Sequence, residues 1–122
     1  MDFKKQKPIY LQIADSLCER ILSGEWAADG RIPSVRDVAG TLGVNPNTVM
    51  RAYDYLQTSQ IIYNRRGVGY FVDPQAKKHI LNLQKEAFIH EVLPTFYHQM
   101  QLLGLTLDDL KELVKNLPDD GE

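Results

Sequence analysis

The sequence predicts a mainly α fold with a small β-hairpin, in which short helices precede the hairpin and further helices follow it. Apolar residues recur every three to four positions along most of the chain, the spacing of helices with one buried face. Two helix-start signals lie close together within residues 34–46, so two helices are joined by a tight turn. Two β-prone runs joined by a basic turn predict the hairpin within residues 61–72.

Length and composition fit one compact domain with a small appendage, since the chain has 122 residues, of which 43% are hydrophobic. No apolar run reaches the roughly 18 residues that cross a bilayer. The first eight residues lack the apolar stretch of a signal peptide, so the protein is expected to be cytoplasmic. Up to Val72, nine Lys and Arg oppose seven Asp and Glu, whereas the remainder has five against nine. This division favours a nucleic-acid partner for the first part.

The first helix is expected to start near Pro8, because proline fits a first turn, and to end at Ser23 and Gly24. Its apolar stripe consists of Ile9, Ile13, Leu17 and Ile21. The second helix begins after Ser34, which forms an S-x-x-D capping-box pattern with Asp37. It ends at Gly43, a residue suited to the left-handed stop of a helix.

The third helix begins directly afterwards, with Asn45 as its cap and Pro46 in its first turn, and runs to about Thr58. One face carries the core residues Val49, Ala52, Tyr53 and Leu56, and the opposite face carries Asn47, Arg51, Asp54 and Thr58. Two helices joined by so short a turn predict a helix-turn-helix, whose second helix projects its first turn into a DNA major groove.

The hairpin pairs residues 61–64 with residues 69–72 around a basic tip of residues 65–68. The order helix, helix-turn-helix and hairpin predicts a winged helix-turn-helix, and residues 1–73 are assigned to this DNA-binding domain. Residues 74–122 are assigned to a helical tail, in which Pro94 is expected to kink a long helix and Thr106 with Asp109 to cap the last one.

The tail is predicted to be a dimerisation element, because two short helices cannot bury all of its large apolar side chains against each other. The residues expected at the dimer interface are Leu93, Phe96, Tyr97, Met100, Leu103, Leu110, Leu113 and Leu117. The tail is too small to enclose an effector pocket, so any small-molecule site would lie between domains or subunits, and expression control by a separate sensor is equally compatible with the sequence.

Four ordered motifs resemble the GntR family of bacterial transcription regulators. They are PIYLQI at residues 8–13, IPSVRDVA at 32–39, GVNPNTV at 43–49 and RRGVGYFV at 65–72. The short tail is similar to that of the YtrA-like branch, since about 50 residues cannot hold the larger effector domains of other members. The resemblance implies a homodimeric repressor that acts on a nearby operon, commonly one for an ABC-type transporter.

The resemblance also implies DNA contacts by Arg36 at the start of the second helix, by Asn45, Asn47 and Thr48, and by Arg66 and Gly67 at the wing tip. This chain has Pro46 and Met50 where many relatives have arginines, and Arg51 is the expected replacement. Side-chain chemistry adds three further cations. They are Lys4 and Lys7, as phosphate contacts, and Arg65, which suits a narrow minor groove.

Each of these assignments has an alternative. Arg51 could form an ion pair with Asp54, Asn45 could serve only as a helix cap, and the wing-tip arginines could merely solubilise a turn. The whole domain could bind a protein instead of DNA. Flat salt dependence of binding would favour that interaction module, because DNA binding weakens steeply with salt.

No sequence motif indicates catalysis, a cofactor or a metal centre. Glu86 and His90 are four residues apart, but a metal site would need further ligands, and His79 and His98 are expected to be ordinary helix residues. Cys18 is expected to be a small core residue rather than a redox switch. The protein is therefore expected not to be an enzyme.

Overall fold

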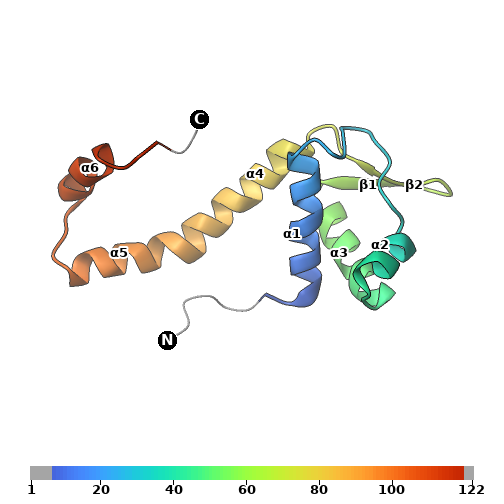
Figure 1. The fold of residues 1–122 in the computed structure, drawn as a ribbon, viewed down its shortest axis with the longest axis horizontal. Coiled ribbons are helices and arrows are strands. Elements are labelled where there is room, and N and C mark those ends of the chain that lie inside the picture. The colour runs from blue at the N-terminus through green and yellow to red at the C-terminus, as the bar shows by residue number, and fades with distance from the viewer. Residues whose placement is uncertain (1–6, 120–122) are drawn as a thin grey trace. The chain divides into compact units, whose positions relative to one another are not determined.

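The computed structural model describes residues 7–119, and the chain divides into two compact units, Met1–Asn82 and Leu83–Glu122. The elements follow one another as three helices, a two-stranded hairpin and further helices (Figure 1). The prediction of a mainly α fold with one small hairpin is confirmed, and the arrangement is that of a winged helix-turn-helix.

The first unit is built around α3 (Pro46–Thr58), which packs against both α1 (Ile9–Leu22) and α2 (Val35–Leu42). Its core contains the stripe predicted for the third helix together with apolar residues from α1, the hairpin and the start of the following helix. The largest fully buried side chains are Tyr53, Ile21, Leu56, Ile61, Ile80, Val49 and Val72.

Local capping sets the short turn between α2 and α3. The Ser34 hydroxyl accepts the N–H of Asp37 at 3.1 Å and starts α2. Gly43 ends it in the left-handed region, with a φ of 68° that a side chain with a Cβ adopts at a cost. The Asn45 side chain then accepts the N–H of Asn47 at 2.8 Å, and Pro46 occupies the first turn of α3.

The hairpin pairs β1 (Ile62–Arg65) antiparallel to β2 (Gly69–Val72), with Ile62 opposite Val72 and Arg65 opposite Gly69. The first strand lies one residue later than the sequence predicted. Ile61 is instead buried in the core before the strand begins, and its N–H donates to the Leu56 carbonyl at 2.9 Å. Arg31 also pairs with Phe71 in an isolated β-bridge, a third strand-like segment that the sequence did not predict.

The remaining helices are α4 (Ala76–Ala87), a π-helical turn (Phe88–Val92), α5 (Leu93–Leu102) and α6 (Leu107–Lys115). The π turn ends two residues before Pro94, the residue expected to disturb this helix. Pro94 has no N–H to donate, and here the N–H of Leu93 bonds to the carbonyl of Phe88, five residues back. The capping box predicted for Thr106 and Asp109 is present at the start of α6. None of the helices in residues 7–119 combines the length and apolarity that crossing a membrane requires.

Candidate nucleic-acid interface

One face of α3 is buried in the core, so the opposite face of the helix points away from it. Val49, Ala52, Tyr53 and Leu56 each have an exposed fraction of 0%. The Tyr53 hydroxyl donates a hydrogen bond to the Pro33 carbonyl just before α2, and its ring meets Tyr70 of β2 edge-on, with centroids 4.8 Å apart. Burial, followed by the neighbouring Tyr70, raises the pKa of the Tyr53 phenol, so this group stays protonated and remains a donor.

Two predicted DNA-contacting residues lie exposed at the starts of the two helices of the helix-turn-helix. Asn47 is in the first turn of α3, and Arg36 is in the first turn of α2. Neither side chain has a hydrogen bond or ion pair to the rest of the described chain. Their polar groups are therefore available to an external partner.

The two other α3 residues expected at DNA are more constrained. Asn45 is the N-cap, so its side-chain oxygen is already used, while its amide nitrogen can still donate. Thr48 is half-buried. Both suit a role in holding the start of α3 against the DNA backbone more than a role in reading bases.

Arg51 is exposed but stacks on α1. Its guanidinium carbon lies 4.1 Å from the centroid of the Tyr10 ring, and Tyr10 in turn meets Tyr55 edge-on at 6.5 Å. The Arg51 side chain therefore does not project freely beside Asn47, as the sequence predicted. The alternative ion pair between Arg51 and Asp54 is also absent from residues 7–119. A contact between a cation and an aromatic face stabilises by about 0.5–1 kcal/mol at exposed sites. This is weak enough for Arg51 to leave the Tyr10 ring and bind DNA.

The wing, which is the β1–β2 hairpin with its turn at residues 66–68, exposes both arginines that the sequence predicted to contact DNA. Arg66 lies in the turn with no partner in the described part of the chain, and the Arg65 guanidinium carbon is 5.4 Å from the centroid of the Phe71 ring. Gly67 adopts a φ of 76°, and a Cβ there would meet nothing within 4 Å. The tip therefore needs glycine for its backbone conformation, not for lack of space.

Phosphate contacts are also predicted for two N-terminal lysines, Lys4 and Lys7. Lys7 is exposed, and its amine lies 2.6 Å from a carboxylate oxygen of Asp15 on α1. A phosphate contact by Lys7 would compete with this ion pair. Lys4 lies outside the described residues.

One cation beside the wing was missed by the sequence reasoning. Arg31 is exposed, pairs with Phe71 on the outer edge of β2, and lays its guanidinium beside Gly69. A single bridging residue gives no periodic signal in the sequence. The proximity of Arg31 to the motif Ile32–Pro33–Ser34 was the one available hint.

In the second unit, most residues predicted for the dimer interface are exposed. The exposed fractions are 42% for Leu93, 41% for Phe96, 49% for Tyr97, 73% for Leu103, 52% for Leu113 and 64% for Leu117. Leu110 is half-buried, and Met100, with 5% exposed, is covered by its own chain. Several of these side chains line an apolar hollow of about 210 Å³ between α5 and α6.

The histidines and Cys18 were considered above for metal binding and redox chemistry, and the structure gives them no such environment within residues 7–119. His90 pairs with Glu86 at 3.1 Å, and no cluster of three His, Cys, Asp or Glu residues occurs among residues 7–119. The His79 ring nitrogen Nδ1 lies 2.7 Å from the Gln60 carbonyl. Burial, followed by the charge of Asp15, raises the pKa of Cys18 to about 12, which keeps the thiol protonated and poorly nucleophilic.

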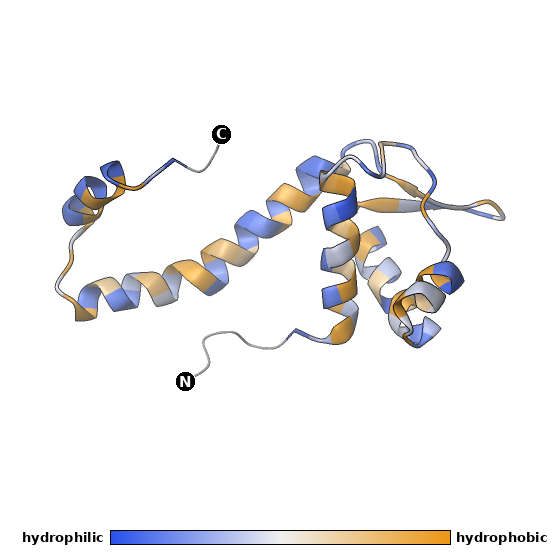
Figure 2. Cartoon of the chain, viewed as in Figure 1, coloured by the Kyte–Doolittle hydropathy of each residue, from blue (hydrophilic) through white to orange (hydrophobic). Residues whose placement is uncertain are grey.

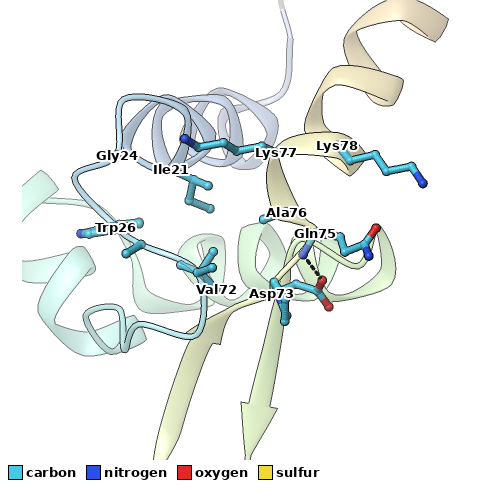
Figure 3. Close-up of a pocket in the computed structure, with 12 residues that line it drawn as sticks. Ile21, Gly24, Trp26, Val72, Asp73, Gln75, Ala76, Lys77 and Lys78 are labelled. Carbon is cyan, nitrogen blue, oxygen red and sulfur yellow. Dashed lines mark hydrogen bonds between the residues drawn. The ribbon is translucent and has the colours of Figure 1, made fainter.

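A pocket of about 520 Å³ lies in the first unit, between the end of α1, the following loop and the start of α4. Trp26 and Val72 contribute apolar surface, while Lys78 extends away from the other labelled side chains (Figure 3). The Asp73 carboxylate is already engaged, because it accepts the N–H of Gln75 at 2.8 Å. None of the predicted DNA-contacting residues lines this pocket, so any ligand there would act on DNA binding indirectly.

Comparison with known proteins gives the same assignment along nearly the whole chain. The model of the bacterial regulatory proteins of the gntR family matches residues 9–72. The HTH-type transcriptional regulator YhcF of Bacillus subtilis is 39% identical over 119 residues, which cover 98% of this chain and 97% of that protein. The HTH-type transcriptional repressor YtrA of the same organism is 32% identical over 120 residues, covering 98% and 92%.

A crystal structure of a GntR-family protein from Bacteroides thetaiotaomicron superposes with a TM-score of 0.80 and 45% identity, over 88% of this chain and 94% of that one. The relatives are transcription regulators and not enzymes, and the exposed start of α3 is the part of such a fold that meets DNA. The chain therefore belongs to the GntR family of bacterial regulatory proteins and is a DNA-binding regulator of the helix-turn-helix type.

Proposed function

We propose that this regulator is a homodimeric repressor that binds a two-part operator near its own gene and controls a neighbouring operon, in the manner of the YtrA-like branch. The observation that carries the proposal is the division of α3 into two faces. Four side chains at 0% exposure hold one face in the core, while Asn47 on the other face has no partner in the described chain. A helix fixed in this way presents its first turn to a groove without reorganisation.

Base reading is assigned to Asn47 and Arg51, and backbone contact to Arg36 and Arg66. An asparagine amide matches the N6 and N7 atoms of adenine, and a guanidinium matches O6 and N7 of guanine. Arg36 at the start of α2 and Arg66 in the wing turn flank α3 in sequence and are both exposed. Cations on either side of a reading helix fix its register on the duplex.

Dimerisation is assigned to the second unit, because most of its large apolar side chains are exposed in the single chain, and exposed apolar patches mark interaction surfaces. Figure 2 shows hydrophobic residues along the helices of the second unit, and their exposed fractions include 53% for Phe88 and 50% for Val92. A second copy offers the same apolar surface, so a two-fold dimer would cover both. Such a dimer would place two α3 helices about one helical turn of DNA apart, or a multiple of it.

Repression is the direction favoured by the relative YtrA, which is named a repressor and aligns with 98% of this chain. A dimer that binds across a promoter would block access of the polymerase by its presence alone. The link to an ABC-type transporter operon follows from the resemblance to the YtrA-like branch.

The proposal predicts a steep salt dependence of DNA binding that involves the wing. The log of the affinity should fall linearly with the log of the salt concentration, with a slope of about −0.9 for each phosphate contacted. Replacing Arg66 with alanine should lower affinity for all sequences and make the slope less negative by about one such step. Fluorescence anisotropy with the chain's own upstream DNA at several salt concentrations measures both quantities.

Arg20→Ala is the matched control, because it removes the same charge from α1, where Arg20 pairs with Glu25 at 2.9 Å and lies 5.5 Å from the Trp26 ring centroid. It should leave the salt slope unchanged. A flat salt dependence of the wild type would support the interaction-module alternative. An unchanged slope for Arg66→Ala alone would remove the wing from the mechanism.

A second prediction concerns Arg51. Arg51→Ala should relax discrimination at one base pair of each half-site by about 1–3 kcal/mol, because a bidentate contact to guanine is lost. Tyr10→Leu removes the ring on which Arg51 stacks but keeps the guanidinium, so it should preserve that base preference. Binding to a set of single-base operator variants measures the effect. If both variants weaken binding to every operator equally, the stack serves only to join α3 to α1.

A further inference from the structure

The outer face of the wing gathers two arginines around a glycine. Residues directly opposite each other in antiparallel strands point to the same face of a sheet. Phe71 of β2 lies opposite Tyr63 of β1 on one side and opposite Arg31 on the other. Arg65 and Gly69, two positions further along their strands, form a pair on that same face. Arg31 and Arg65 therefore lie on one face, on the two edges of β2.

Gly69 adjoins both arginines, one through its side chain and the other through strand pairing. A Cβ built on Gly69 would lie 3.0 Å from Nε and 3.3 Å from Nη2 of Arg31, so this guanidinium rests almost directly on the glycine backbone. Arg65 is the cross-strand partner of Gly69. Gly69 also has a φ of 146°, which disfavours other residues. The absence of a side chain at Gly69 allows the Arg31 guanidinium to lie over β2, on the face that carries Arg65.

The surrounding charges do not neutralise this pair. Within residues 7–119, neither Arg31 nor Arg65 has a hydrogen bond or ion pair to a carboxylate. The carboxylate of Asp29 instead accepts the Tyr63 hydroxyl at 2.8 Å. The aromatic pair of Tyr63 and Phe71, stacked with centroids 5.6 Å apart, supplies a rigid base beneath the Arg65 guanidinium. Two cations on one face that have no counter-ion among residues 7–119 form a surface complementary to an anion.

We propose that Arg31 and Arg65 together bind one phosphate of the DNA backbone, next to the groove entered by the wing tip. The inference rests on the proposed function, since the DNA duplex supplies the phosphate. Guanidinium groups bind phosphate oxygens through paired N–H donors. This contact reads no base. The contact fixes the position of the wing on the DNA duplex, and it thereby fixes the register of α3 along the groove.

The test compares Arg31→Gln, Arg31→Lys and wild type on the same operator. Arg31→Gln should bind all operator variants more weakly and by the same factor. Raising the salt from about 50 to about 200 mM should weaken its binding about 3.5-fold less than it weakens the binding of wild type, which corresponds to one phosphate contact. Arg31→Lys keeps the charge and should retain the wild-type slope. The midpoint of urea unfolding should be the same for all three, because the Arg31 side chain is exposed and unpaired.

Ethylation of single operator phosphates identifies the contact directly. In wild type, ethylating one phosphate in each half-site should weaken binding, and the same phosphate should lose its effect in both Arg31→Gln and Arg65→Gln. If Arg31→Gln keeps the wild-type affinity, slope and ethylation pattern while Arg66→Ala lowers the slope, the inference is wrong and the proposed function stands. If wild type shows no salt-dependent binding to DNA, the proposed function itself fails.

Discussion

Replacing Leu113 with aspartate should convert the protein from a dimer into a monomer. The Leu113 side chain is 52% exposed in the single chain and lines the apolar hollow between α5 and α6. In a two-fold interface the change occurs twice, and each new carboxylate would lose its water without gaining a partner, a cost of several kcal/mol. Light scattering at micromolar concentration gives the mass of the particle, which should halve.

The same variant should bind a two-part operator no more tightly than a single half-site. Linking two DNA-binding units raises the overall affinity by on the order of 10²–10⁴-fold over one unit, and a monomer forfeits this gain. Leu42→Asp is the control for the particle mass, because Leu42 on α2 is a leucine of similar exposure, 43%, outside the second unit. A Leu113→Asp protein that stays dimeric would show that the interface lies elsewhere.

Removing the Tyr53 side chain should have the largest effect on stability. Tyr53→Ala should lower the free energy of unfolding by about 3–5 kcal/mol, because a fully buried aromatic ring leaves a cavity. Tyr53→Phe keeps the ring but leaves the Pro33 carbonyl without its donor, which should cost about 1–3 kcal/mol. Urea unfolding followed by circular dichroism measures both changes.

Tyr63→Phe provides the matched comparison for the hydroxyl. It also removes a hydrogen bond, to the Asp29 carboxylate, but the groups involved are exposed and water can replace the lost partner. Its effect should stay below about 0.5 kcal/mol, as for most surface substitutions. Equal losses for Tyr53→Phe and Tyr63→Phe would show that the bond to Pro33 does not hold α3 against the start of α2.

The elements that the sequence predicted well are those with local causes. Ser34, Gly43 and Asn45 act on backbone groups within a few residues of themselves, so their patterns were sufficient to place both ends of α2 and the start of α3. The start of β1 was missed by one residue because a bond from Ile61 to Leu56 and a positive φ at Gln60 decide it. The bridge between Arg31 and Phe71 joins distant parts of the chain and leaves no periodic trace.

The candidate site shows the same limit at the level of side chains. Helical periodicity gives the direction in which a Cβ leaves α3, and this placed Asn47 outward and Val49 inward. It does not give the position of the end of a long side chain, and the Arg51 guanidinium was found on Tyr10 of another helix. In the second unit, the apolar pattern predicted which large residues share a helix face. It did not predict that one of them, Met100, would be covered by its own chain.

If the exposed first turn of α3 reads DNA bases, Asn47→Ala should change how the protein discriminates among DNA sequences. Wild type and variant are titrated with a set of operators that differ by single base pairs, and Thr58→Ala, an exposed polar change at the far end of α3, serves as the control. We expect Asn47→Ala to lose about 1–3 kcal/mol of discrimination at one or two adjacent base pairs in each half-site, with unchanged affinity for random DNA. A variant that discriminates among the operators as well as wild type and Thr58→Ala do would contradict the claim.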